Sequence, residues 1–199
     1  MESKFGSVIS RGFFLLLITG PLFSSYFWIN QRTDITHSQV TMPEWVPFWP
    51  ILALPYLAVL LTPAIGIFFI RKEQLFRRFA LSFIPAYGVV ALIWIFVPTE
   101  MIRPEVPPET LYQPYRDLIA IDRPVCVLPC GHIVGPMLLT CFLVKENRKH
   151  LRWLISFLAI ASVSIVGTWQ HRPIDVLIGM GISTAVAALF LWKKKPHSA

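Results

Sequence analysis

Six stretches of the chain are strongly apolar and almost free of charged residues, and short polar segments separate them. A helix rises about 1.5 Å per residue, so stretches of roughly 20 residues reach across the ~30 Å hydrocarbon core of a bilayer. Lipid offers the backbone no hydrogen-bonding partner, which favours helices throughout. The pattern predicts an all-α polytopic membrane protein, a single domain over residues 1–199 with six transmembrane helices at about 12–31, 46–70, 79–98, 130–144, 153–170 and 173–192.

Composition agrees with this prediction. Hydrophobic residues make up 55% of the chain and charged residues only 15%, and the mean hydropathy is +0.60. Charges are too few to cover a soluble domain of this size. The sequence is therefore that of an integral multi-pass membrane protein.

The distribution of Lys and Arg predicts an orientation. If the N-terminus is cytoplasmic, 13 of the 18 basic residues fall in cytoplasmic segments, with the basic turns at 71–78 and 145–152 and the lysines at 193–195 among them. Positive charge is retained on the cytoplasmic side, so both termini are expected there. The net charge of +7 is then a topology signal, and no nucleic-acid partner is expected. A second interpretation of the first stretch is a secretory signal peptide, because Lys4 and Arg11 precede it and Ser24 and Ser25 follow its core.

One long connection, residues 98–129, is expected on the outer face. It holds seven of the chain's prolines, which rule out one continuous helix. Its apolar residues favour a segment lying on the membrane surface, with Arg116, Asp117, Asp122 and Arg123 toward water. The alternative is an unstructured linker.

The chain's candidate chemistry lies in two histidines and an aspartate. Pro173 can open a helix near His171, and an i,i+4 spacing would then bring Asp175 to the same face. The carboxylate could hold one imidazole nitrogen and leave the other basic. The plain alternative is that both residues only cap a helix end.

His132 is expected at the same membrane depth as His171. Both would lie where inward-running helices begin, and helix N-termini attract anions. Arg103, Arg116, Arg123 and Arg172 are expected on that side, with guanidinium groups suited to phosphate. His171 could attack phosphorus to form a phosphohistidine, while His132 gives a proton to the leaving oxygen. Water or an alcohol would then take the phosphoryl group.

The three cysteines, Cys126, Cys130 and Cys141, do not form a disulfide framework. Cys126, Cys130 and His132 could also form a zinc site, but no fourth ligand is evident. No metal and no cofactor are expected.

The motifs around the histidines resemble those of the phosphatidic acid phosphatase type 2 superfamily. Leu128-Pro-Cys-Gly-His132 is similar to its Pro-Ser-Gly-His motif, and the residues from Ser164 to Gly179 are similar to its Ser-Arg-x5-His-x3-Asp motif. Arg103-Pro104 looks like the end of the Lys-x6-Arg-Pro motif. The resemblance implies a six-span membrane fold with His171 as nucleophile and His132 as general acid. It also implies that Asp175 orients His171 and that Gly131 lets the backbone approach the phosphate.

Three positions depart from the family pattern. Phe96 stands at the motif Lys, Cys130 at the Ser and Ile165 at the Arg. Arg123 and Arg172 are the candidate replacements for the lost cations. The spacing around His171 is closer to the sphingolipid-synthase-like branch, which raises the possibility of headgroup transfer.

The function expected from the sequence is that of an integral membrane lipid phosphatase. It would hydrolyse a lipid phosphomonoester or diphosphate through a phosphohistidine at the outer membrane–water interface, in a cell inner membrane or its equivalent. The substrate would be held by Arg103, Arg123, Arg172, Gly131 and Cys130. The alternatives are a lipid phosphotransferase and a catalytically silent protein that binds lipid phosphates. A transporter is less favoured because the ionisable residues gather at one face.

Overall fold

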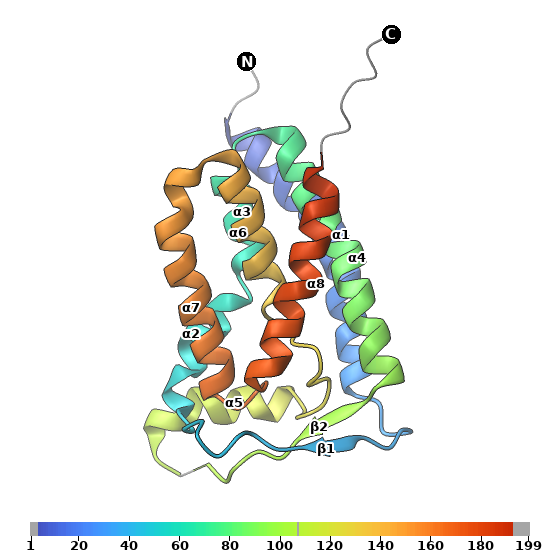
Figure 1. Ribbon diagram of the computed structural model, residues 1–199, viewed down its shortest axis with the longest axis vertical. Coiled ribbons are helices and arrows are strands. Elements are labelled where there is room, and N and C mark those ends of the chain that lie inside the picture. Colours follow the sequence, from blue (N-terminus) through green and yellow to red (C-terminus); the bar gives the residue numbers. More distant parts are fainter. Residues whose placement is uncertain (1–3, 107, 193–199) are drawn as a thin grey trace.

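A computed structural model describes residues 4–106 and 108–192 of the chain. The lysines at 193–195, which contribute to the charge bias, lie outside the described residues. Within the described part the chain is mostly helical, with its long helices side by side along one axis (Figure 1). The first described turn of α1 and the last turn of α8 lie at the same end of this bundle.

Within residues 4–106 and 108–192, four helices are long and apolar enough to cross a membrane. Their outward faces carry large apolar side chains, such as Phe13 at 64% exposure, as expected of surfaces that face lipid. They are α1 (Lys4–Asn30), α4 (Glu73–Phe96), α7 (Leu151–Gly167, preceded by the 3-10 turn η3, Arg148–His150) and α8 (Pro173–Leu191).

The second apolar stretch is a broken helix, as its prolines predict. The 3-10 turn η1 (Pro50–Leu52) leads into α2 (Ala53–Val59), and α3 (Thr62–Phe69) follows at an angle of 43°. Pro63 has no N–H to give and its ring crowds the carbonyl of Val59. The hydroxyl of Thr62 donates to that carbonyl instead. If this pair counts as one span, the described chain has five segments of spanning length.

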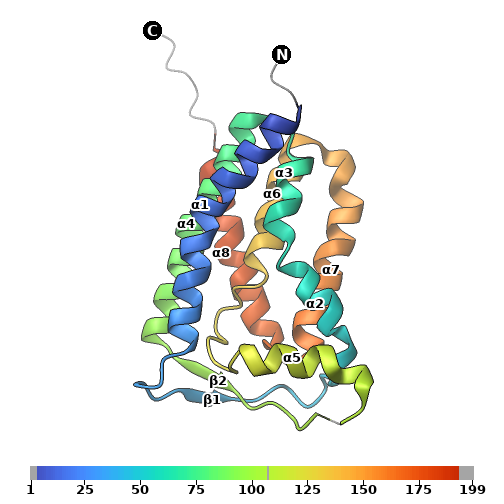
Figure 2. The same ribbon diagram turned by 180° about the vertical axis from the view of Figure 1, so that it is seen from behind.

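The fourth predicted stretch, 130–144, forms a shorter helix than expected. Helix α6 (Val134–Glu146) has 13 residues, which is only about 20 Å. It packs in the centre of the bundle against α8, α4, α7 and α3. Pro129 and Gly131 lie in the non-helical segment before it, and this segment rises from the level of α5 into the bundle (Figure 2). The length of α6 alone therefore does not establish a sixth span.

The described part of the connection between α4 and α6 closes one end of the bundle. Strand β2 (Thr99–Met101) pairs in parallel with β1 (Ser38–Val40), a ribbon that the sequence pattern did not predict. The 3-10 turn η2 (Thr110–Tyr112) and helix α5 (Gln113–Ile121) then lie across the bundle end (Figures 1 and 2). Tyr115 and Leu118 are buried.

Asp122 corrects one expectation for this connection. It was predicted to point to water, but it is only 8% exposed. Its carboxylate accepts a hydrogen bond from the hydroxyl of Tyr26 and another from Asn30 Nδ2 at 3.2 Å. Asp122 therefore joins α1 to the connection rather than facing solvent.

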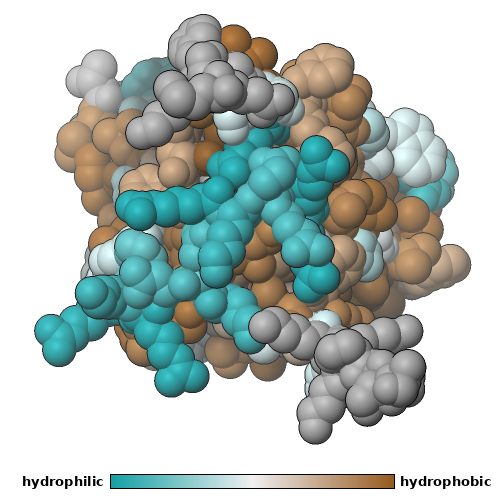
Figure 3. Space-filling view, turned by 90° about the horizontal axis from the view of Figure 1, so that it is seen from above, coloured by the Kyte–Doolittle hydropathy of each residue, from teal (hydrophilic) through white to brown (hydrophobic). Residues whose placement is uncertain are grey.

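The opposite end of the bundle gathers the basic turns, and Figure 3 shows hydrophilic side chains across this face. Half-buried Arg11 donates to the carbonyl oxygens of Ile67 and Ile70 at the C-terminus of α3, at 3.2 and 2.7 Å. A cation at a helix C-terminus also interacts favourably with the helix dipole. Helix α1 begins at Lys4, before the predicted residue 12, and therefore includes Arg11.

Candidate functional site

The two histidines of the predicted motifs meet. Nδ1 of His132, which lies just before α6, is 2.9 Å from Nε2 of His171, which lies just before α8. The two residues are 39 positions apart in the chain, so the contact depends on the packing of α6 against α8. The expected proximity of the two imidazoles is confirmed.

One arrangement of hydrogens satisfies both rings when both are neutral. A carbonyl oxygen can only accept, so His171 Nδ1 donates to Val127 O at 2.6 Å and its Nε2 carries the lone pair. His132 Nδ1 must then donate to that lone pair. His132 Nε2 is left to accept from the hydroxyl of Tyr56 at 2.7 Å. The result is a directed chain from Tyr56 through both imidazoles to Val127.

Burial favours the neutral form of both rings, which lie in non-helical connections outside the candidate spans. Burial lowers the pKa of His171 well below its usual value, and nearby His132 and Arg103 lower it further. Burial also lowers the pKa of His132, although Asp122 opposes the shift. His171 therefore keeps an unprotonated nitrogen at neutral pH.

Asp175 does not orient His171, contrary to the sequence-based expectation. Its carboxylate accepts from the backbone N–H of Arg172 at 2.8 Å and from the Arg172 guanidinium at 3.0 and 2.8 Å. Helix α8 starts at Pro173, so His171 precedes the helix and the i,i+4 geometry does not apply. Asp175 instead caps α8 and pairs with Arg172, which agrees with the alternative that it only caps a helix end. The carbonyl oxygen of Val127 accepts from His171 Nδ1, where the Asp175 carboxylate was expected.

Of the three arginines expected to hold phosphate, one lies at the histidine pair. Arg103 donates to the carbonyl of Asp122 at 2.8 Å and to Gln170 Oε1, and Gln170 directly precedes His171. Arg123 instead donates to the carbonyl of Arg32 at 2.9 Å, beyond the end of α1. Arg172 is committed to Asp175. Arg123 and Arg172 therefore do not replace the missing cations in this conformation.

Four buried side-chain atoms have no hydrogen-bond partner among the described residues, and all four carry hydrogens to donate. They belong to Arg103 (Nε), Tyr115 (OH), Trp169 (Nε1) and Gln170 (Nε2). Burial raises the pKa of Tyr115 to about 12, so its hydroxyl stays a donor at neutral pH. An unpaired buried donor costs about 1–3 kcal/mol. Arg103 pairs with Gln170 directly before His171, so the free donors of these two side chains lie where an oxygen-rich ligand could accept from them.

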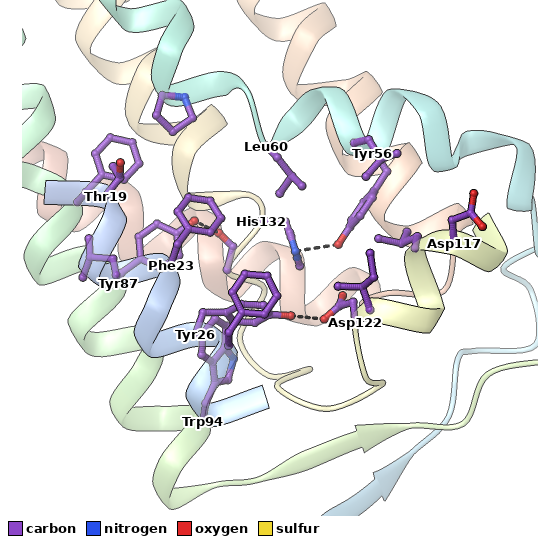
Figure 4. A pocket seen from close by; sticks show the side chains of 18 of the residues that line it. Thr19, Phe23, Tyr26, Tyr56, Leu60, Tyr87, Trp94, Asp117, Asp122 and His132 are labelled. Atoms are coloured by element: carbon purple, nitrogen blue, oxygen red, sulfur yellow. Dashed lines mark hydrogen bonds between the residues drawn. The ribbon is translucent and has the colours of Figure 1, made fainter. Parts of the chain in front are cut away.

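A cavity of about 440 Å³ opens beside His132, between α1, α2, α4 and α5 (Figure 4). This volume lies within the range of roughly 300–1,000 Å³ that small-molecule sites occupy. Its wall is mainly apolar, with Phe23 and Leu60 typical of it, and His132, Tyr26 and Asp122 are among the few polar groups. His132 therefore stands between the cavity and His171.

Gly131 and Cys130 occupy the site for packing reasons. A Cβ on Gly131 would lie 2.7 Å from the Trp94 ring, so the glycine permits contact with Trp94, and the predicted backbone approach to phosphate is not what requires it here. Cys130 is fully buried, and its N–H donates to the carbonyl of Asp175 at 3.0 Å.

Sequence reasoning missed Tyr56, Gln170, Tyr115 and Asp122. Tyr56 lies in an apolar stretch and resembles a core residue, although a buried tyrosine hydroxyl usually needs a partner, which was the available signal. Gln170 belongs to a quoted motif but was given no role. Tyr115 and Asp122 reach the site only because α5 crosses the bundle end, which the sequence did not reveal.

No protein-family model, curated protein or solved structure matches the chain.

Proposed function

We propose that the protein is an integral membrane lipid phosphatase that forms a phosphohistidine on His171. The observation that carries the proposal is the contact of 2.9 Å between His132 Nδ1 and His171 Nε2, beside an apolar cavity. His171 Nε2 presents a lone pair and His132 Nδ1 presents a hydrogen where the two rings meet. Phosphoryl transfer needs both, because the lone pair attacks phosphorus and the hydrogen goes to the leaving group.

The first step would transfer the phosphoryl group to His171. The phosphate enters between the two rings, so that His132 turns its N–H from His171 to the leaving oxygen. The His171 Nε2–P bond forms as the ester P–O bond breaks, and His132 gives its proton to the lipid alkoxide. A phosphate dianion beside His132 favours the imidazolium form of this ring, so on substrate binding the neutral His132 takes a second proton from solvent and becomes the acid.

The second step would release phosphate. His132, now lacking that proton, takes one from water as the oxygen attacks phosphorus and the N–P bond breaks. The His171 lone pair and the His132 imidazolium are then restored, and His132 returns its second proton to solvent as phosphate leaves. Throughout, Val127 O would hold the His171 ring through Nδ1–H.

The unpartnered donors support an anionic substrate. Arg103 carries a positive charge beside the histidines, and its Nε has no acceptor in the described part of the chain. Gln170 Nε2 and the Tyr115 hydroxyl likewise have no acceptor among those residues. In this proposal the phosphate oxygens accept hydrogen bonds from these donors. The donors thereby take the place of the Lys and Arg that the family pattern has at the positions of Phe96 and Ile165.

A lipid headgroup transferase is the second candidate. The observation in its favour is Asp122, a carboxylate at the cavity wall held by Tyr26 and Asn30. A carboxylate there could accept the hydrogen of an alcohol and direct that alcohol to phosphorus. In this variant an alcohol replaces water in the second step.

We further propose that α6 completes a six-span topology with both termini cytoplasmic, and that the segment before it lies at the outer membrane–water interface. The apolar outer faces of the helices and the basic end of the bundle support this arrangement (Figure 3). The histidine pair would then face the periplasm, exterior or lumen.

The test is a product assay on purified protein in lipid nanodiscs. Lipid phosphomonoesters and diphosphates are offered with and without a lipid alcohol, and free phosphate and new phospholipid are both measured. We expect phosphate release from the parent, loss of at least 100-fold in His171→Ala, and acid-labile phosphate on the parent only. His150→Ala, at the opposite end of the bundle, is the control. Equal release by His171→Ala and the parent would refute the proposal, and new phospholipid as the main product would select the transferase.

A further inference from the structure

The side chains of Cys130, His132 and His171 converge on one point beside the histidine pair. Each offers one ligand atom, and the three atoms all lie within 4.8 Å of one another. Cys130 is fully buried and His171 is nearly so. A thiol and two imidazoles are the side chains that Zn²⁺ prefers.

The hydrogen bonds of the two rings have the form found at metal centres. A histidine that binds a metal usually donates its other ring N–H to a fixed protein oxygen, which sets the ring orientation. His171 does so through Nδ1, to Val127 O at 2.6 Å. His132 has its Nε2 against the Tyr56 hydroxyl at 2.7 Å. Each ring thus presents its remaining nitrogen to the same point.

Little movement is needed to seat a metal between these nitrogens. The two atoms are 2.9 Å apart with one hydrogen between them. Ligand nitrogens at about 2.0–2.1 Å from a tetrahedral zinc lie roughly 3.3 Å apart. The rings would therefore separate by only a few tenths of an ångström.

The third ligand is held by its backbone. The N–H of Cys130 donates to the carbonyl of Asp175 at 3.0 Å. Burial keeps the thiol protonated by raising its pKa, while the backbone N–H groups of Ile133 and His132 act in the opposite direction. A bound cation deprotonates a coordinating thiol, and those N–H groups would stabilise the thiolate.

We propose that Cys130, His132 and His171 form a zinc-binding site with one open coordination position. On binding, the Cys130 proton is released to solvent and the His132 proton moves from Nδ1 to Nε2, where it donates to Tyr56. The site differs from the Cys126, Cys130 and His132 set weighed from sequence, because His171 takes the place of Cys126. Resting on the proposed function, we add that zinc switches off phosphoryl transfer, since it occupies the His171 lone pair.

The binding test uses full-length protein in detergent, stripped with EDTA and titrated with ZnCl₂. We expect about one zinc per chain by elemental analysis and a rise in thermal stability on binding. Co²⁺ in place of zinc should show a thiolate charge-transfer band. Cys130→Ser should bind zinc at least 10-fold more weakly and lose that band, whereas the matched control Cys126→Ser should keep both.

Two outcomes would overturn the zinc site: a parent that binds no zinc at 100-fold molar excess, or a Cys130→Ser variant that binds like the parent. Unfolding of each zinc-free variant is measured first, and Cys130→Ala is used if the serine variant does not fold. The inhibition is tested separately as zinc sensitivity relative to each variant's own zinc-free rate. Full activity with zinc bound would overturn the inhibition, whereas a protein that binds zinc but shows no phosphatase activity would refute only the proposed function.

Discussion

Gly179 of α8 lies directly against the carbonyl oxygen of Cys130. A Cβ on Gly179 would come within 2.4 Å of that oxygen and 2.7 Å of Ile133 Cγ2. Because the backbone of Cys130 continues into His132, this contact sets how deeply the first histidine is seated beside the second. The closeness of α8 to the segment before α6 is thus part of the site.

Gly179→Ala should therefore destabilise the protein and misplace His132. Overpacking costs about 1–3 kcal/mol, and a backbone oxygen cannot move aside as a flexible side chain can. Gly181→Ala is the matched control, since a Cβ there meets nothing within 4 Å and alanine favours helix. Thermal unfolding in detergent and the rate of phosphate release should both fall for Gly179→Ala only. Equal behaviour of the two variants would contradict the packing argument.

Tyr56→Phe should lower kcat while leaving the fold intact. The phenylalanine keeps the ring but removes the hydroxyl that bonds His132 Nε2. One neutral hydrogen bond contributes about 0.5–1.5 kcal/mol, so we expect a loss of about 2- to 10-fold. Tyr112→Phe serves as control, because Tyr112 lies in η2, outside the hydrogen-bonded chain that runs through the imidazoles. A parent-like kcat in Tyr56→Phe would show that this bond does not position His132.

Asp175→Asn and Arg172→Gln should act as one unit. Each breaks the same pairing at the start of α8, where the Asp175 side chain is fully buried. We expect each to lower the free energy of unfolding by about 1–3 kcal/mol, with the double variant well short of the sum. Chemical unfolding of the four proteins measures this coupling. A different outcome would support a direct catalytic role of Asp175: Asp175→Asn loses phosphate release but no stability, while Arg172→Gln keeps the parent rate.

Leu60→Trp should discriminate lipid substrates from soluble ones. Leu60 lines the cavity beside His132, so an indole there would fill space that a lipid chain needs. KM for a long-chain lipid phosphate should rise at least 10-fold, while activity on a water-soluble phosphate ester stays within about twofold. Leu61→Trp is the neighbouring control, because Leu61 is 64% exposed on the outer face. Similar kinetics for both variants would argue against the cavity as the substrate site.

Hydropathy predicted the long helices well because lipid allows few alternatives. The stretch 173–192 corresponds closely to α8, and the stretch 79–98 lies mostly within α4, which begins six residues earlier than predicted, at Glu73. The prolines of the second stretch correctly predicted a break. The shortness of α6 and the β1–β2 ribbon were not predictable, because both depend on how the proline-rich connection folds against the bundle.

The site was predictable where it depended on helix ends, and not where it depended on local geometry. Placing His132 and His171 at the starts of two neighbouring helices predicted their contact. The role of Asp175 was wrong because it assumed a helix start at His171, two residues early. Nothing in the sequence pointed to Val127, because it contributes a backbone carbonyl to the site and any residue type could supply that group.

The chain order of the two imidazoles has a consequence for biosynthesis. A nascent chain that has emerged only as far as α6 already contains Tyr56, Arg103 and His132, but the ring that accepts from His132 arrives with the final two helices. Ribosomes release segments from the N-terminus onward, so His132 has no partner ring until α7 and the turn before α8 have also emerged. Under the proposed function, a product that ends at α6 would lack the nucleophile, and phosphoryl transfer would begin only once α8 packs against α6.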